Sequence, residues 1–342
     1  MMAFLKNKLT IRMLTSLVVV LSLLSGYSFY LIKQHNIPLC VMRERTLDEK
    51  LKILRLNENG LSYTRPLLLA DQMHPAQTFS ELKDKVSDLI EERINKGDAE
   101  DVSVYFRSLN DGRWFEINET HLFNPASLLK MSIMICFLKK VEKNPELLKE
   151  KIYVKGVSPD LRDPRNKGNY LEPHQYYHLE DLLYKMICGS DNESANLLVE
   201  KITPAEFSHF YAELDIHNEK IAELDYQLNV TDFSKFLRIL YNSTYLSPKY
   251  SEYALKLLTN TSYHNGINRY FQNQLTVAHK FGERIFPEHC QIHDSGILYI
   301  KNTPVLLTVM SKGKHQANLE QLLADIGKLV KEDVEAHQSV YN

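Results

Sequence analysis

The order of strand-like and helix-like segments limits the fold of this chain more than any other feature. Two β-rich runs, residues 102–109 and 113–117, flank an Asn-Asp-Gly turn signal and predict a hairpin. Two further apolar runs, residues 297–300 and 304–310, predict strands near the end of the chain. Apolar residues at helical spacing fill the region between these two pairs of strands.

The predicted helices each repeat apolar residues every three or four positions. They cover residues 79–96, 128–141, 179–189, 193–201, 204–214, 231–241, 249–259 and 317–336. Because strands open and close this pattern, we expect an α+β domain with the layers of an α/β/α sandwich. Its antiparallel sheet is built from the N- and C-terminal parts, and an all-helical insert lies between them.

A run of 20 residues without a charge, residues 13–32, precedes the regular pattern. It is long enough to cross a hydrocarbon core of about 30 Å. Three basic residues stand before it, so the positive-inside rule leaves residues 1–12 in the cytoplasm and exports the rest. A cleaved signal peptide is the alternative, but no small-x-small cleavage site follows the run.

This arrangement predicts four parts. A cytoplasmic tail at residues 1–12 is followed by an uncleaved, single-pass anchor in the inner membrane at residues 13–32. A stalk occupies residues 33–75, and residues 76–338 form the extracytoplasmic domain. The lipid bilayer is therefore an expected partner.

Composition excludes nucleic acid as a partner and a disulfide framework as the basis of stability. Lys and Arg number 41 against 43 Asp and Glu, and a nucleic-acid binder needs a basic excess that is absent here. Four cysteines in 342 residues make no disulfide framework. A single bond between Cys136 and Cys188 stays an open alternative to two buried thiols.

Ser127-Leu-Leu-Lys130 stands at the start of a predicted helix. Positions i and i+3 share a helix face, so the hydroxyl and the amine can meet. A serine becomes a good nucleophile when a base takes its proton, and a lysine is such a base when burial or a nearby cation lowers its pKa. A capping Ser followed by a surface Lys has the same spacing.

Two more short motifs follow along the chain. Ser-Asp-Asn at residues 190–192 joins two predicted helices, where it can direct a hydroxyl and an amide into a cleft or simply cap the second helix. Lys-Phe-Gly at residues 280–282 follows a strand-like run. The glycine leaves the backbone open to a ligand, although an edge-strand Lys that discourages aggregation fits as well.

In this order, the three motifs resemble the S-x-x-K, S-D-N and K-T-G set of class A β-lactamases and penicillin-binding proteins. The resemblance covers residues 76–336: a hairpin, FNPASLLK opening a long helix, the GSDNESANLL corner, the AHKFG strand, two strands and a helix. The chain is most similar to membrane-anchored serine hydrolases of the class A β-lactamase-like kind. The resemblance implies the fold of that family.

The resemblance also implies roles for five residues. Ser127 would be the acylated nucleophile, and Lys130 would accept its proton. Ser190 would relay a proton to the leaving nitrogen, while Asn192 would orient Lys130 and the substrate amide. Lys280 would attract the substrate carboxylate and keep the pKa of Lys130 low.

The end of the third motif would contribute to substrate binding. The backbone N–H groups of Ser127 and Glu283 would form the oxyanion hole, with Gly282 between them and Lys280. Phe281 departs from the family, because it replaces the Thr or Ser hydroxyl that helps to hold a β-lactam carboxylate. That departure concerns antibiotic recognition and leaves the nucleophile untouched.

A second departure concerns the base for deacylation. The family carries E-x-x-L-N on a loop between the second and third motifs. The nearest match here is Asp225-Tyr-Gln-Leu-Asn229, with Glu223 just before it, on a loop that is shorter than usual. Asp225 and Glu223 are the candidates, and without a working base the acyl-enzyme would persist.

No metal or cofactor is expected. His289 and His293 lie beside Cys290 and Asp294, but on a strand positions i and i+4 are about 13 Å apart, too far to share an ion. His174 and His178 have helical spacing without a general base between them.

The leading hypothesis is thus a serine hydrolase that forms an acyl-enzyme with a β-lactam or a D-Ala-D-Ala-type cell-wall peptide, with slow deacylation. The alternative is a catalytically weak, penicillin-binding-like module that binds wall peptide or an exported protein. Phe281 and the uncertain base favour the alternative, whereas the complete set of five polar site residues favours the enzyme.

Overall fold

The computed structural model describes residues 53–55, 60–70, 79–158, 170–216, 226–272 and 274–338. The predicted anchor and the two candidate deacylation bases, Glu223 and Asp225, lie outside these ranges. Within the ranges, no helix combines the length and the apolar character needed to span a bilayer.

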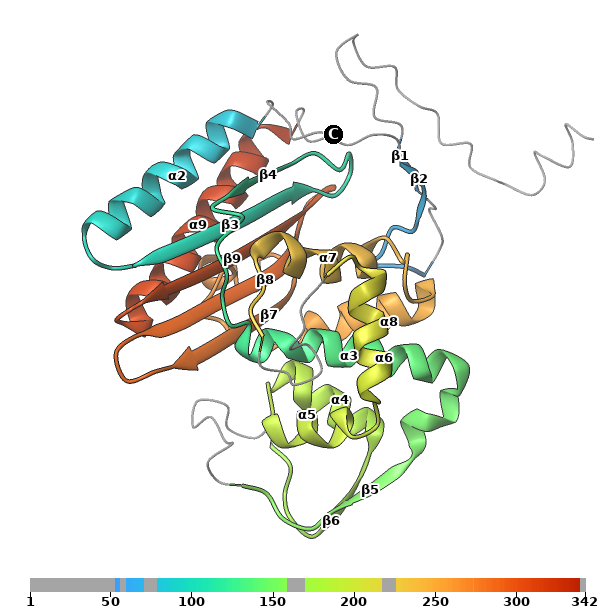
Figure 1. Ribbon diagram of the computed structural model, residues 1–342. Helices are drawn as coiled ribbons and strands as arrows, with labels where there is room; N and C mark the ends of the chain where they lie inside the picture. Colours follow the sequence, from blue (N-terminus) through green and yellow to red (C-terminus); the bar gives the residue numbers. More distant parts are fainter. Residues whose placement is uncertain are drawn as a thin grey trace, which may run out of the picture. The chain divides into compact units, whose positions relative to one another are not determined.

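A five-stranded antiparallel sheet, in the order β4-β3-β9-β8-β7, forms the centre of the domain (Figure 1). Its strands are β3 (Asp101–Ser108), β4 (Trp114–Ile117), β7 (Val277–Ile285), β8 (Cys290–Ile300) and β9 (Thr303–Gly313). β3 pairs with β9 along its whole length, so the two ends of the domain meet in one sheet. This confirms the predicted α+β fold.

Helices cover both faces of the sheet (Figure 1). On one face lie α2 (Ser80–Asn95) and α9 (Gln316–Ala336). The other side holds the 3-10 turn η2 (Ala126–Leu128) and α3 (Leu129–Lys143), α4 (Leu179–Cys188), α5 (Asn192–Val199), α6 (Pro204–Glu213), α7 (Val230–Tyr241) and α8 (Pro248–Leu258). The predicted helical insert is therefore present, between β4 and β7.

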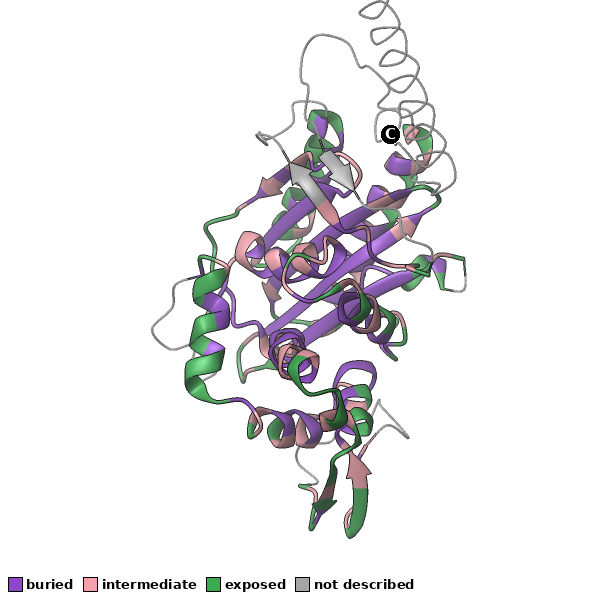
Figure 2. Cartoon of the chain, turned by 90° about the vertical axis from the view of Figure 1, so that its right-hand side faces the viewer, coloured by how far each residue is buried: buried purple, intermediate pink, exposed green. Residues whose placement is uncertain are grey.

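The sheet separates two hydrophobic clusters, because successive side chains of a strand point to opposite faces. On β3, Val104 and Phe106 join the cluster under α2 and α9, whereas Tyr105 between them joins the helical cluster. Figure 2 shows the central strands as buried along most of their length. A sheet covered on both faces provides a rigid support for residues at its edge.

Part of the predicted stalk is attached to the domain. The carboxylate of Glu252 on α8 accepts hydrogen bonds from three consecutive backbone N–H groups, those of residues 62–64. Thr64 is fully buried. Nearby, β1 (Ile53–Arg55) pairs with β2 (Leu67–Ala70). The segment 60–67 thus follows the surface of α7 and α8.

Two short strands in the helical region had no counterpart in the sequence prediction. β5 (Lys151–Val154) and β6 (Gln175–His178) pair in an antiparallel hairpin that leads into α4. The hairpin exposes Tyr153 and Tyr176, whose rings lie 5.0 Å apart.

Candidate active site

Ser127 lies in the 3-10 turn η2, immediately before α3, and not within the first turn of an α-helix as predicted. The preceding residue, Ala126, has a φ of +50°. This left-handed conformation costs a residue with a side chain about 1–3 kcal/mol and persists only where the surroundings hold it. Strain therefore marks the backbone directly before the candidate nucleophile.

The surroundings that hold this turn come from the sheet. The backbone N–H of Asn124 donates to Gln291 on β8 (3.0 Å), and its carbonyl accepts from His293 Nε2 (3.0 Å). The Asn124 side chain accepts from the N–H of Ala126 (3.0 Å). Because Nδ1 of His293 accepts from the N–H of Ser311 (3.1 Å), the ring is a neutral imidazole with its proton on Nε2.

Lys130 is only 4% exposed, which excludes the surface lysine that a chance motif would place here. Its Nζ lies 3.1 Å from Ser127 Oγ. It also lies 2.6 Å from both the carbonyl of Ser190 and Oδ1 of Asn192. These two oxygens can only accept hydrogen bonds, so each takes one N–H group of Lys130. The third side of Nζ then faces the hydroxyl groups of Ser127 and Ser190. Lys130 Nζ is thus held within hydrogen-bonding distance of the Ser127 hydroxyl.

The corner between α4 and α5 brings the second motif to Lys130. Ser190 has a φ of +54°, a left-handed conformation that reverses the chain between the two helices. Asp191 caps α5, because its carboxylate accepts from both the backbone N–H and the hydroxyl of Ser194. The corner is thus a capping turn as well as part of the site: its middle residue is structural, while Ser190 and Asn192 contact Lys130.

Lys280 on β7 is fully buried and closes the cluster. Its Nζ donates to Ser190 Oγ (2.9 Å) and to the carbonyl of Phe281 (2.9 Å). Ser190 Oγ is also 3.1 Å from Lys130 Nζ, so this hydroxyl bridges the two lysines. Burial, followed by repulsion from Lys130, holds the pKa of Lys280 well below its usual value.

β7 is the edge strand of the sheet, and it lies against η2 at Gly282. A Cβ at Gly282 would lie 2.6 Å from the carbonyl oxygen of Pro125 and 2.9 Å from the Leu128 side chain. Only glycine permits this approach. Next to it, the side chain of Glu283 accepts from Gln316 on α9 (3.1 Å), which leaves the predicted oxyanion role to its backbone N–H.

Phe281 stacks on Tyr263, with ring centroids 4.1 Å apart and an angle of 16° between the planes. Lys280 Nζ lies 4.1 Å from the centre of the Phe281 ring. The residue that replaces the family hydroxyl is thus part of an aromatic pair that covers the lysine.

The segment that leads into α7 lies next to the serine turn. Leu228 and Phe123 exchange backbone hydrogen bonds of 2.9 and 3.0 Å as an isolated antiparallel bridge. Asn229, the last residue of the predicted E-x-x-L-N counterpart, caps α7 by accepting from the N–H of Asp232 (2.8 Å). The roles of Glu223 and Asp225, which precede this bridge, stay predictions.

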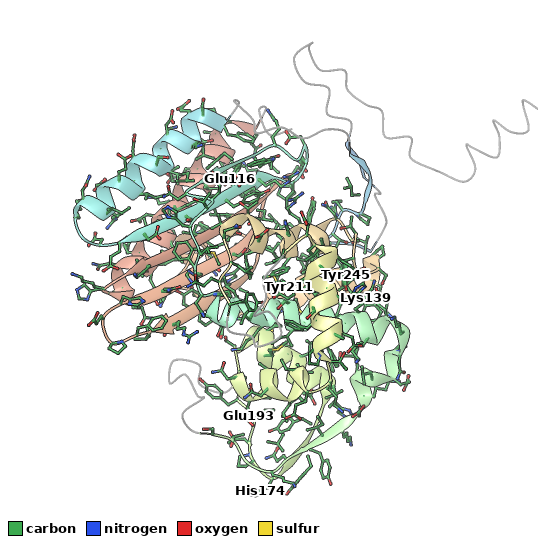
Figure 3. All side chains as sticks on the ribbon, viewed as in Figure 1. Glu116, Lys139, His174, Glu193, Tyr211 and Tyr245 are labelled. Carbon is green, nitrogen blue, oxygen red and sulfur yellow. The ribbon has the colours of Figure 1, made fainter. Side chains whose placement is uncertain are left out.

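The other His and Cys candidates have structural partners. His174 lies on the β5–β6 hairpin (Figure 3). His178 is the last residue of β6 and the N-cap residue of α4, so the two histidines do not share a helix face as their spacing suggested. Cys136 and Cys188 are free, buried thiols, which excludes a disulfide between them. No group of three metal-ligating side chains occurs within the described ranges.

The structure brings together five of the residues that the sequence singled out: Ser127, Lys130, Ser190, Asn192 and Lys280. A model of the β-lactamase enzyme family (Beta-lactamase2) matches residues 81–334. The chain belongs to this family. The match confirms the class A β-lactamase-like and penicillin-binding-like resemblance of the three motifs.

Solved structures of β-lactamases share this fold. A β-lactamase from Chitinophaga pinensis DSM 2588 superposes with a TM-score of 0.64 at 20% identity, over 74% of this chain and 99% of that one. A class A β-lactamase from Bacteroides cellulosilyticus DSM 14838 has a TM-score of 0.65 at 17% identity, and the match covers 78% of this chain and 100% of that one. A mutant of PBP-A, solved as an acyl-enzyme complex with penicillin G, has a TM-score of 0.63 at 20% identity, and the match covers 77% of this chain and 100% of that one. No curated protein sequence matches the chain.

Sequence reasoning missed the residues that support the site. Gln291 and His293 hold the serine turn, and Asp294 on the same strand is fully buried beside Lys280. A polar run directly before an apolar strand was the available signal. It pointed to buried hydrogen bonds, not to the metal ligands considered for His293 and Asp294.

Proposed function

We propose that the protein is a serine hydrolase that forms an acyl-enzyme at Ser127. The observation that carries this proposal is the set of contacts at Lys130 Nζ, where two carbonyl-type oxygens at 2.6 Å and the Ser127 hydroxyl at 3.1 Å surround a buried amine. Such a nitrogen is positioned as a general base. Membership of the β-lactamase family supports the same chemistry.

In the acylation step, Ser127 Oγ bonds to the substrate carbonyl carbon, and its proton moves to Lys130. The backbone N–H groups of Ser127 and Glu283 are the proposed donors to the developing oxyanion. The bond to the leaving group then breaks. Ser190 gives the leaving atom a proton and takes one from Lys130, so the lysine returns to its neutral form.

The proposed acyl donors are a β-lactam or a D-Ala-D-Ala-type peptide of the cell wall. Release of the acyl group requires a base that directs water to the ester, and the candidates are Glu223 and Asp225. Because their segment is short, we propose that deacylation is the slow step and that the acyl-enzyme accumulates.

Nitrocefin hydrolysis by the purified protein tests this proposal. The expected trace is an initial burst close to the enzyme concentration, followed by slow release, since acylation outruns deacylation. Losing a positioned base slows a step by about 10²–10⁴-fold. Rapid turnover without a burst, abolished by changing Glu223 or Asp225 to Ala, would show an efficient deacylation base and refute the slow step.

The alternative, a catalytically weak, penicillin-binding-like module that binds wall peptide or an exported protein, is not favoured. A module that only binds peptide has no need for a buried lysine directed at a serine hydroxyl, and the family match is to enzymes.

A further inference from the structure

Lys280 belongs to the Ser127 cluster, yet it is enclosed. Its side chain is 0% exposed, and two of its three N–H groups donate to Ser190 Oγ and the Phe281 carbonyl. A lysine that binds an anionic substrate must present a donor to the cavity that the substrate enters. Here both hydrogen bonds go to oxygen atoms of the protein itself.

The Phe281 ring covers what remains of the ammonium group. The ring centre is 4.1 Å from Nζ, and the ring is itself held by stacking on Tyr263. Phe281 and Tyr263 are 7% and 8% exposed, so the pair is packed into the protein. A carboxylate can reach Lys280 only if this aromatic pair separates.

A buried acid reduces the positive potential further. Asp294 faces Phe281 across the β7–β8 pair and is fully buried. Its carboxylate is fixed by His279 Nδ1 (2.9 Å) and by the N–H of Ile267 (3.1 Å). It is close enough to Lys280 for its negative charge to raise the pKa of that lysine. Asp294 therefore offsets part of the positive charge of Lys280 from within the protein.

Arg284 lies on the same strand but cannot take the place of Lys280. The two residues are four positions apart, which corresponds to about 13 Å along β7. Its guanidinium group lies over Phe286 near the far end of the strand.

From this geometry we infer that the site prefers acyl donors whose leaving group carries no free carboxylate, namely uncharged esters and internal amides. The inference rests on the proposed acyl-enzyme function and narrows its substrate class, because a D-Ala-D-Ala peptide or a β-lactam with a free carboxylate would then be a poorer acyl donor than its uncharged ester. An uncharged leaving group placed against the aromatic pair of Phe281 and Tyr263 loses much less hydration free energy than a carboxylate would.

A matched pair of ester substrates tests the inference with the full-length protein. One is the phenylacetylglycyl ester of 3-hydroxybenzoic acid, and the other is the same ester of methyl 3-hydroxybenzoate. The two leaving phenols have the same skeleton, and dividing kcat/KM by the hydroxide-catalysed rate of each compound removes their difference in reactivity. We expect the normalised kcat/KM of the uncharged ester to be at least about tenfold higher, the size of one lost charged hydrogen bond.

The variant Phe281→Thr removes the ring and supplies a hydroxyl. It is expected to shift the ratio toward the carboxylate ester by about 10–100-fold. Phe286→Thr, at the exposed turn after β7, is the matched control and should leave the ratio unchanged.

The wild-type ratio does not depend on the folding of any variant. A wild-type preference for the carboxylate ester, with acylation at Ser127 seen by mass spectrometry, would overturn the inference and leave the proposed function standing. If neither ester acylates Ser127, the proposed function itself fails, and the inference falls with it.

Discussion

Burial decides what single side chains can do at this site. A lysine in water is protonated at neutral pH and is no base, but Lys130 is 4% exposed and Lys280 is fully buried. Helical spacing predicted that Ser127 and Lys130 would meet, and the family resemblance implied that Ser190, Asn192 and Lys280 would join them. The sequence could not predict that Phe281 covers Lys280, since that contact depends on Tyr263, which lies outside all three motifs.

Lys130→Ala is expected to slow acylation of Ser127 by about 10²–10⁴-fold, the usual contribution of a general base. The measurement is the rate of covalent labelling in single-turnover conditions. Lys139→Ala is the control on the same helix, because Lys139 donates to the Tyr245 carbonyl away from the cluster (Figure 3). Equal labelling rates in the Lys130 variant and the control would exclude the role of base.

His293 should make stability depend on pH. Burial lowers the pKa of His293 from 6.5 to about 4, so the folded protein keeps the ring neutral while the unfolded chain protonates it. Its contribution is present above about pH 6.5 and is lost as the pH falls toward 4, by roughly 3 kcal/mol in total.

Urea unfolding at pH 7 and pH 4.5 measures this contribution. His293→Gln keeps a donor and an acceptor and should flatten the loss of stability over this range. The control, His289→Gln, lies outside the buried network and should retain the wild-type loss. The same pH dependence in both variants would contradict the assignment.

At the scale of elements, the site depends on how β7 meets η2. The sequence located β9 and the end of β8 well, because their runs are apolar. The apolar run marked only residues 297–300 of β8, and residues 290–296 were considered as a strand only in weighing a metal site, because their side chains are mostly polar. In the fold those side chains are buried and paired, as in the contact of Ser295 with Thr308 (2.7 Å), which only the assembled sheet provides.

Gly282→Ala is expected to push β7 away from η2, because the added Cβ would lie 2.6 Å from the Pro125 carbonyl. Acylation should fall by about 10²-fold, since displacement of a catalytic group by about 1 Å has that effect. Gly156→Ala, where a Cβ meets nothing within 4 Å, is the control. Pre-steady-state acylation rates of the two variants give the comparison, and matching rates would show that the close approach has no role in catalysis.

At the scale of the whole molecule, segment order predicted the sheet and the helical insert, because strands from both ends must share one sheet to bury their faces. The attachment of residues 62–64 to Glu252 was not predictable, since it joins segments nearly 190 residues apart through backbone N–H groups. The anchor at residues 13–32 stays a proposal.

Protease added to spheroplasts tests the proposed topology. If residues 13–32 span the inner membrane, as their length and the preceding basic residues predict, the domain should be digested from outside. A tagged cytoplasmic protein in the same cells should survive as the control. Protection of an intact chain would place the domain on the cytoplasmic side and contradict the proposal.

The most direct test of the central claim is the intact mass of the full-length protein after incubation with a small panel of β-lactams and their methyl esters. If Ser127 is the nucleophile, each chain should carry one acyl adduct at Ser127 that persists after excess compound is removed and is absent from Ser127→Ala. No adduct with any compound, or an equal adduct on Ser127→Ala, would contradict the claim.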